Sequence, residues 1–122
     1  MAVMGQSLPT ACFEREWVWY LETHGHRVLK RRPGSGVVKS RDEHGQRYRW
    51  LLRSEGGASV LLSVAERKEL RRQRRLAREA GERCFLVVRF GHLAGRAVAL
   101  PVARACEMKR VSANMGGIPW DA

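Results

Sequence analysis

Cys84-Phe85-Leu86-Val87-Val88-Arg89-Phe90 is an almost unbroken apolar run, typical of a strand buried on both faces. It follows a helical pattern over residues 66–80, in which Leu70, Ala77 and Ala80 recur on one side and Gly81 supplies the stop. A strand that returns to a hairpin-rich sheet after such a helix makes the sheet mixed. The sequence therefore predicts an α/β fold in which residues 84–90 form a central strand with a helix on each face.

Hydrophobic spacing and turn residues locate the other elements. The expected elements are a helix at 9–24, strands at 26–32, 47–53, 58–65 and 97–102, and a short helix at 103–108. The strands at 47–53 and 58–65 resemble a hairpin around Glu55-Gly56-Gly57. We expect one domain over residues 1–122, with a core at 8–110 and a tail at 111–122.

The charge of the chain points to a polyanionic partner. Its 122 residues include 23 Lys and Arg but only 12 Asp and Glu, which gives a net charge of +11. So large a charge on a small body repels itself, and nucleic acid is a partner that relieves the repulsion. The alternative is a basic protein without such a partner. Without a membrane-spanning apolar run or a signal-like start, the expected location is cytoplasmic, with no membrane partner.

Two groups of basic residues are candidates for contact with nucleic acid. The first lies on or near the expected strand at 26–32 and consists of Lys30, Arg31, Arg32 and Lys39. The second lies along residues 66–80 and consists of Arg67, Arg71, Arg74, Arg75 and Arg78. Spacings of three and four gather like charges on one side of a helix, which is unfavourable unless a counterion such as phosphate is present. A solvated helix face is the alternative explanation.

Three stretches carry a resemblance to a known family. They are Phe13-Glu14-Arg15-Glu16, the basic segment leading to Gly34-Ser35-Gly36, and the strand Phe85-Leu86-Val87-Val88-Arg89-Phe90. Over residues 12–102 the chain resembles the PD-(D/E)XK nuclease superfamily, and within it the small Holliday-junction resolvases. The resemblance implies a restriction-endonuclease-like αβββαβ core, with a mixed sheet and helices on both faces. It also implies that Glu14 helps to bind a metal, that Ser35 lies beside the active site, and that the protein is a homodimer.

The family has an aspartate at the start of its second strand and a Glu-x-Lys on its third. The two carboxylates bind Mg²⁺, and the lysine orients or activates the attacking water. In this chain Arg47-Tyr48-Arg49 opens the second strand, and the nearest substitute carboxylates are Asp42 and Glu43 in the preceding loop. The aspartate position of the resemblance is therefore unfilled unless Asp42 replaces it.

The third strand leaves two alignments open. Hydrophobic pattern places Ser63-Val64-Ala65 at the Glu-x-Lys position, which would be an inactive motif. A shift of register gives Glu66-Arg67-Lys68 instead, with Glu66 and Lys68 on one face of the strand as catalytic residues. The alternative for Glu66 is an acidic residue in the first turn of a helix, where the helix dipole favours it.

These observations support three functions. The first is a nucleic-acid-binding protein of resolvase-like fold that binds branched or duplex DNA and has lost catalysis. The second is a structure-specific DNA endonuclease that depends on Mg²⁺, with Glu14, Asp42 and Glu66 at the metal and Ser35 and Lys68 completing the catalytic set. The third is a basic RNA-binding or ribosome-associated protein, which fits the charge alone.

Overall fold

The structure is a computed structural model, and it describes residues 10–91 and 96–115. Residue 9 of the expected first helix and residues 116–122 of the expected tail lie outside this part of the chain. The elements are α1 (Thr10–Thr23), β1 (Arg27–Val28), β2 (Val37–Arg41), β3 (Arg47–Glu55), β4 (Ser59–Leu61), α2 (Val64–Glu79), β5 (Glu82–Phe90), β6 (Arg96–Pro101), α3 (Val102–Ala105) and β7 (Arg110–Ser112). No helix in the described ranges has the length and apolar character needed to cross a bilayer.

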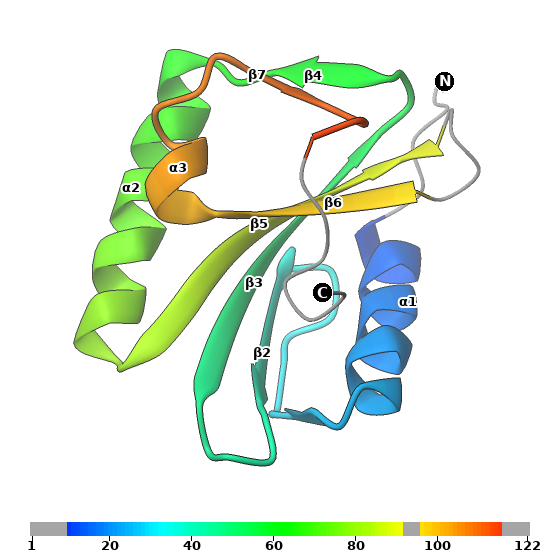
Figure 1. Cartoon of the computed structure of the whole chain (residues 1–122), viewed down its shortest axis with the longest axis vertical. Helices are drawn as coiled ribbons and strands as arrows, with labels where there is room; N and C mark the ends of the chain where they lie inside the picture. Colours follow the sequence, from blue (N-terminus) through cyan, green and yellow to red (C-terminus); the bar gives the residue numbers. More distant parts are fainter. Residues whose placement is uncertain (1–9, 92–95, 116–122) are drawn as a thin grey trace.

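The main sheet is mixed, as the sequence predicts. Its strand order is β1-β2-β3-β5-β6, with β3 and β5 parallel and the other neighbours antiparallel. Strand β5 therefore lies inside the sheet, between β3 and β6. The two long helices flank the sheet on opposite sides (Figure 1). Phe13, Trp17 and Leu21 of α1 pack on one face, and Leu70 of α2 packs on the other. The predicted α/β fold with a helix on each face of β5 is confirmed.

The expected strand at 26–32 is mostly wrong. Only Arg27–Val28 pairs with β2, and the chain then turns towards α1. The reason is local: Arg31 and the backbone of the following glycine turn donate hydrogen bonds to Glu14 on α1. The N–H of Leu29 still donates to the carbonyl oxygen of Lys39 at 3.0 Å, and beyond it the chain leaves the sheet edge to bring the amides of Gly34 and Gly36 to Glu14.

The expected hairpin is also wrong. Strand β3 pairs with β2 on one side and β5 on the other, so neither edge is open to the next segment. After the turn at Gly56 and Gly57 the chain forms β4, which pairs with β7 in a separate two-stranded sheet (Figure 1). Val60 of β4 and Val111 of β7 still reach the core on the α2 side. Strand β4 ends at Leu61, because Ser63 caps α2.

His26 links the end of α1 to the sheet. It is 8% exposed, and its Nδ1 lies 2.9 Å from the Oγ of Ser40 on β2. The Nε1–H of Trp50 donates to the same hydroxyl oxygen at 2.9 Å. Burial lowers the pKa of His26 below its ordinary value of 6.5; the neighbouring charge of Asp42 opposes this shift, and His24 adds to it. The ring is therefore neutral in the folded protein near pH 7.

We expect this buried ring to make folding stability depend on pH. The pKa of His26 is lower in the folded than in the unfolded chain, so the unfolded chain binds more protons as pH falls through 6.5. The stability that neutral His26 contributes is thus fully present above about pH 6.5 and declines below that pH. Urea unfolding between pH 7.5 and 5.5 should show this loss, and His26→Gln should reduce it. The control is His44→Gln, at an exposed turn residue. It should leave the change in the free energy of unfolding with pH as it is in the unmodified protein. If the free energy of unfolding changes equally with pH in the unmodified protein and in both variants, the prediction is wrong.

Candidate nucleic-acid interface

Glu14 is buried and fully engaged by its own chain. Its side chain is 0% exposed, although it carries a charge. One carboxylate oxygen accepts from Nη1 of Arg31 at 2.7 Å and from the backbone N–H of Gly34 at 3.0 Å. The other accepts from the backbone N–H of Gly36 at 2.7 Å. Glu14 therefore anchors the glycine turn to α1, and three donors occupy the oxygens that a metal ion would need.

The glycine turn has the backbone geometry that this anchor requires. Gly34 and Gly36 have φ values of +84° and +79°, in the left-handed region that other residues seldom adopt. Both amides can therefore point at one carboxylate. Ser35 between them is exposed, and its hydroxyl accepts from the N–H of Val37 at 3.2 Å. The turn that holds Ser35 is thus bound to Glu14 through its glycine amides, whereas the hydrogen bonds of the Ser35 hydroxyl are to Val37 in its own turn.

Asp42 supports the turn between β2 and β3. One of its oxygens accepts from the backbone N–H groups of His44 and Gln46, both at 2.9 Å. The other accepts from the hydroxyl of Tyr48 at 2.9 Å. Burial alone would raise the pKa of Asp42, but the hydrogen bonds from Tyr48, Gln46 and His44 lower it below its usual value. Asp42 is thus a turn residue whose oxygens are occupied by donors of its own loop.

Glu66 and Lys68 lie on α2, so the alignment that places them on one face of a strand is wrong. The other alignment is wrong as well, because Ser63 is the N-cap of α2 and Val64 and Ala65 are its first residues. Ser63 accepts from the N–H of Glu66 at 3.0 Å, and Glu66 accepts from the N–H of Ser63 at 3.1 Å, which is a capping box. The second oxygen of Glu66 forms an ion pair with Arg53 of β3. Lys68 is exposed on the helix. The helix-start alternative for Glu66 is therefore the one that the structure supports.

The candidate metal ligands do not come together. Glu66 and Ser35 line the same surface pocket of about 270 Å³ between α2 and the β2–β3 strands, but Glu14 and Asp42 are not among its lining residues. Among the described residues no group of three or more His, Cys, Asp or Glu side chains could hold a metal ion. The residues present therefore do not fit the Mg²⁺ ion that the resemblance implies.

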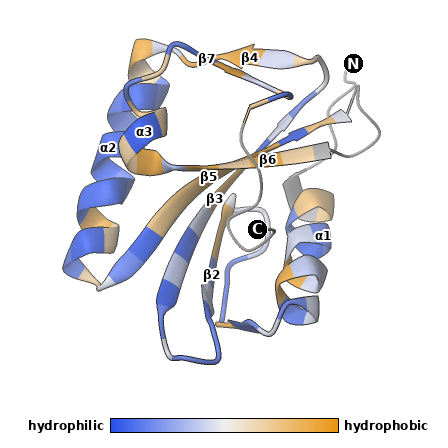
Figure 2. Cartoon of the chain, in the orientation of Figure 1, coloured by the Kyte–Doolittle hydropathy of each residue, from blue (hydrophilic) through white to orange (hydrophobic). Residues whose placement is uncertain are grey.

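The predicted basic residues divide into paired and unpaired groups. Arg31 pairs with Glu14, and Lys39 pairs with Glu82 at 3.5 Å. Arg71 donates to the carbonyl oxygen of Cys106 at 3.3 Å, so it helps to hold α3. Arg67 is half-buried, whereas the remaining candidates are exposed and form no ion pair with another described residue: Lys30, Arg32, Arg74, Arg75 and Arg78. Figure 2 shows that most residues of α2 are hydrophilic, whereas those of β5 and β6 are mostly hydrophobic.

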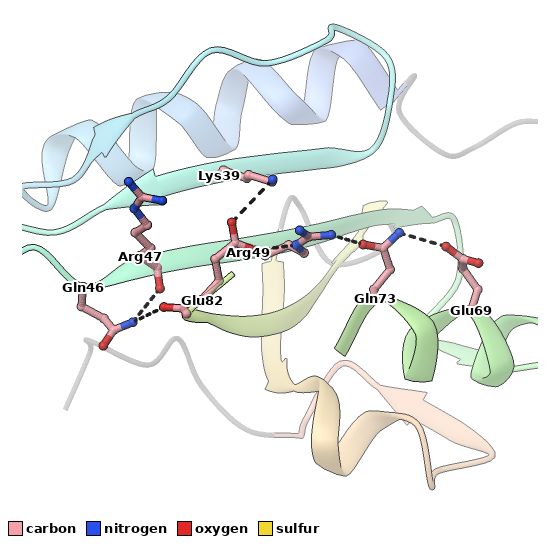
Figure 3. A network of polar contacts seen from close by, with 8 residues as sticks. Lys39, Gln46, Arg47, Arg49, Glu69, Gln73 and Glu82 are labelled. Atoms are coloured by element: carbon pink, nitrogen blue, oxygen red, sulfur yellow. Dashed lines mark hydrogen bonds and ion pairs between the residues drawn. The ribbon is translucent and has the colours of Figure 1, made fainter. Parts of the chain in front are cut away.

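A polar network that the sequence reading missed joins the sheet to α2 (Figure 3). Glu82 at the start of β5 accepts from Nε of Arg49 at 2.7 Å and also pairs with Lys39. Arg49 donates through Nη1 to Oε1 of Gln73 at 2.6 Å, and Gln73 donates to Glu69 at 2.9 Å. The only sequence signal was the alternation of charged residues along the β3 segment. The partners come from distant elements, so no local pattern reveals them.

We expect Glu14 to be needed for folding. Glu14→Gln removes the charge opposite Arg31 and places an amide among donors, which should lower the free energy of unfolding by about 3 kcal/mol. Urea unfolding measures the loss. The matched control is Glu16→Gln on the same helix, whose ion pair with Arg89 has a half-exposed carboxylate and should contribute less than about 1 kcal/mol. Equal losses in the two variants would show that the anchor is not needed.

Comparison with known proteins identifies no relative of this chain. The chain matches none of the protein-family models, curated proteins or solved structures with which it was compared. Its function therefore has to be inferred from its own residues and their geometry.

Proposed function

We propose that this protein binds nucleic acid, specifically branched or duplex DNA, through phosphate contacts. We also propose that it is not a metal-dependent nuclease. The observation that carries the proposal is the group of exposed arginines on α2, Arg74, Arg75 and Arg78, which have no acidic partner in the described part of the chain. Guanidinium groups form bidentate hydrogen bonds with phosphate oxygens, and they stay charged at any physiological pH.

The shape of the surface supports a phosphate partner. Arg74 and Arg78 line a surface pocket of about 290 Å³ together with Arg83 of β5. The Arg83 guanidinium carbon lies 5.8 Å from the centre of the Tyr48 ring and 5.4 Å from that of Phe85, and this stacking favours one orientation of the side chain. Glu82 also lines this pocket, but it already pairs with Lys39 and Arg49. The pocket therefore keeps an excess of positive charge, which a bound phosphate would balance.

The engaged carboxylates favour a binding protein over a nuclease. Glu14 anchors a turn, Asp42 holds a second turn, and Glu66 caps a helix. A metal-dependent endonuclease needs carboxylates that are free and adjacent. Strand β4 lies between β3 and α2 in the chain but belongs to the separate two-stranded sheet. With β4 set aside, the order α1, β1, β2, β3, α2, β5 supports a nuclease-like αβββαβ core as part of this proposal. A homodimer remains a prediction that follows from the resemblance alone.

A combined binding and cleavage assay tests the proposal. The protein should bind a four-way junction and a linear duplex, and it should cut neither substrate with Mg²⁺ or Mn²⁺. Cleavage with either metal would revive the endonuclease alternative. Tight binding to RNA with no binding to either DNA would favour the RNA-binding alternative.

The α2 arginines make a quantitative prediction. Arg74→Gln with Arg78→Gln should lower the slope of log affinity against log salt by up to about 1.8, because each phosphate contact to duplex DNA contributes about 0.9. The control is Arg72→Gln with Arg89→Gln. It removes the same charge, but Arg72 and Arg89 already pair with Glu69 and Glu16 at 2.8 Å. If both double variants change the slope equally, α2 is not a specific contact surface.

A further inference from the structure

Three arginines lie side by side on adjacent strands of the main sheet. Arg27 of β1 is directly opposite Arg41 of β2, and Arg41 is directly opposite Arg47 of β3. Side chains of directly opposed residues project from the same face of an antiparallel pair. Arg27, Arg41 and Arg47 therefore form one row across the sheet, which we call the arginine row.

The row lies on the face of the sheet that carries α2. Val37 lies four residues before Arg41 on β2, and Leu51 lies four residues after Arg47 on β3, so both project from the same face as the row. Val37 and Leu51 pack in the core on the α2 side. Their neighbours Val38 and Trp50 pack on the opposite side, against α1. Helix α2 covers this face at β5, whereas α1 packs on β1, β2 and β3 from the other face. Arg27 and Arg47 are accordingly exposed, and Arg41 is half-buried.

The neighbouring pair of cations shares a carboxylate, but the arginine row has none. Lys39 and Arg49 are also directly opposed, and Glu82 pairs with both, at 3.5 and 2.7 Å. Glu82 is in register with Arg47, yet its carboxylate bonds to the other two cations. In Figure 3 no dashed line reaches the guanidinium of Arg47. None of the three row side chains forms an ion pair with another described residue.

An unneutralised row of this kind is unfavourable in the free protein. Like charges directly opposite each other destabilise a sheet, and here two such pairs share Arg41. Neighbouring strands lie about 4.8 Å apart, so the three arginines of the row start from backbone positions that span about 10 Å. That span suits phosphates of a duplex backbone, because a minor groove is about 6 Å wide and each strand carries one charge per 3.4 Å of axis.

We propose that the arginine row is a phosphate-binding surface for duplex DNA, separate from the arginines on α2. The inference rests on the proposed nucleic-acid function and specifies a surface for it. The row includes Arg47, near which the resemblance leads one to expect a metal-binding aspartate. A cation at that place contacts a phosphate directly, whereas a carboxylate would need a metal ion between itself and the phosphate.

The test compares Arg27→Gln with Arg47→Gln against the control Arg72→Gln with Arg89→Gln on the same linear duplex. The row variant should lower the salt slope by up to about 1.8, and the control should leave it nearly unchanged. Urea unfolding checks folding: the row variant should be at least as stable as the unmodified protein, because a like-charge contact has been removed.

The outcomes separate this inference from the proposed function. If the unmodified protein binds no DNA, the proposed function fails and the inference fails with it. If the unmodified protein binds and the row variant keeps its salt slope, the inference is overturned while the proposed function stands. A row variant that loses duplex RNA binding and keeps duplex DNA binding would overturn the assignment to DNA.

Discussion

The buried carboxylate of Glu14 constrains the path of the chain between α1 and the sheet. An isolated buried charge is too costly to keep, so Glu14 has to be met by donors. Arg31, Gly34 and Gly36 supply them, which fixes where the segment after β1 turns and where β2 begins. The register of β2 decides which of its side chains face α1, since a slip by one residue would exchange the two faces.

The same register sets the charge of the two sheet faces. With Val38 and Ser40 on the α1 side, β2 directs Lys39 and Arg41 to the α2 side. Arg49 of β3 reaches the same side, where it meets Glu82. A contact between α1 and the glycine turn thus sets the character of both faces over β1, β2 and β3. The face towards α1 is aromatic and closed, and the other face carries basic residues at the end of these strands that α2 leaves open.

The elements that could be predicted from the sequence are those with a strong local pattern. The apolar run of β5 and the helical spacing of Phe13, Trp17 and Leu21 identify their elements and the faces that they bury. Residues 58–65 carry an equally apolar pattern, but the partner of β4 is β7, far away in the chain and only three residues long. A local pattern cannot reveal a pairing of that kind.

The candidate site was harder to predict because a carboxylate's role depends on its donors. The Ser63-x-x-Glu66 spacing is a capping-box signature and could have identified Glu66 as a helix-start residue. Acidic residues also meet several largely buried arginines: the side chains of Arg31, Arg49 and Arg89, which are 21%, 10% and 17% exposed, all form ion pairs. Burial penalises an unpaired charge, so these arginines need the carboxylates most. With 23 cations and 12 acids, the excess positive charge falls to arginines that water can reach, where an external phosphate can also reach them.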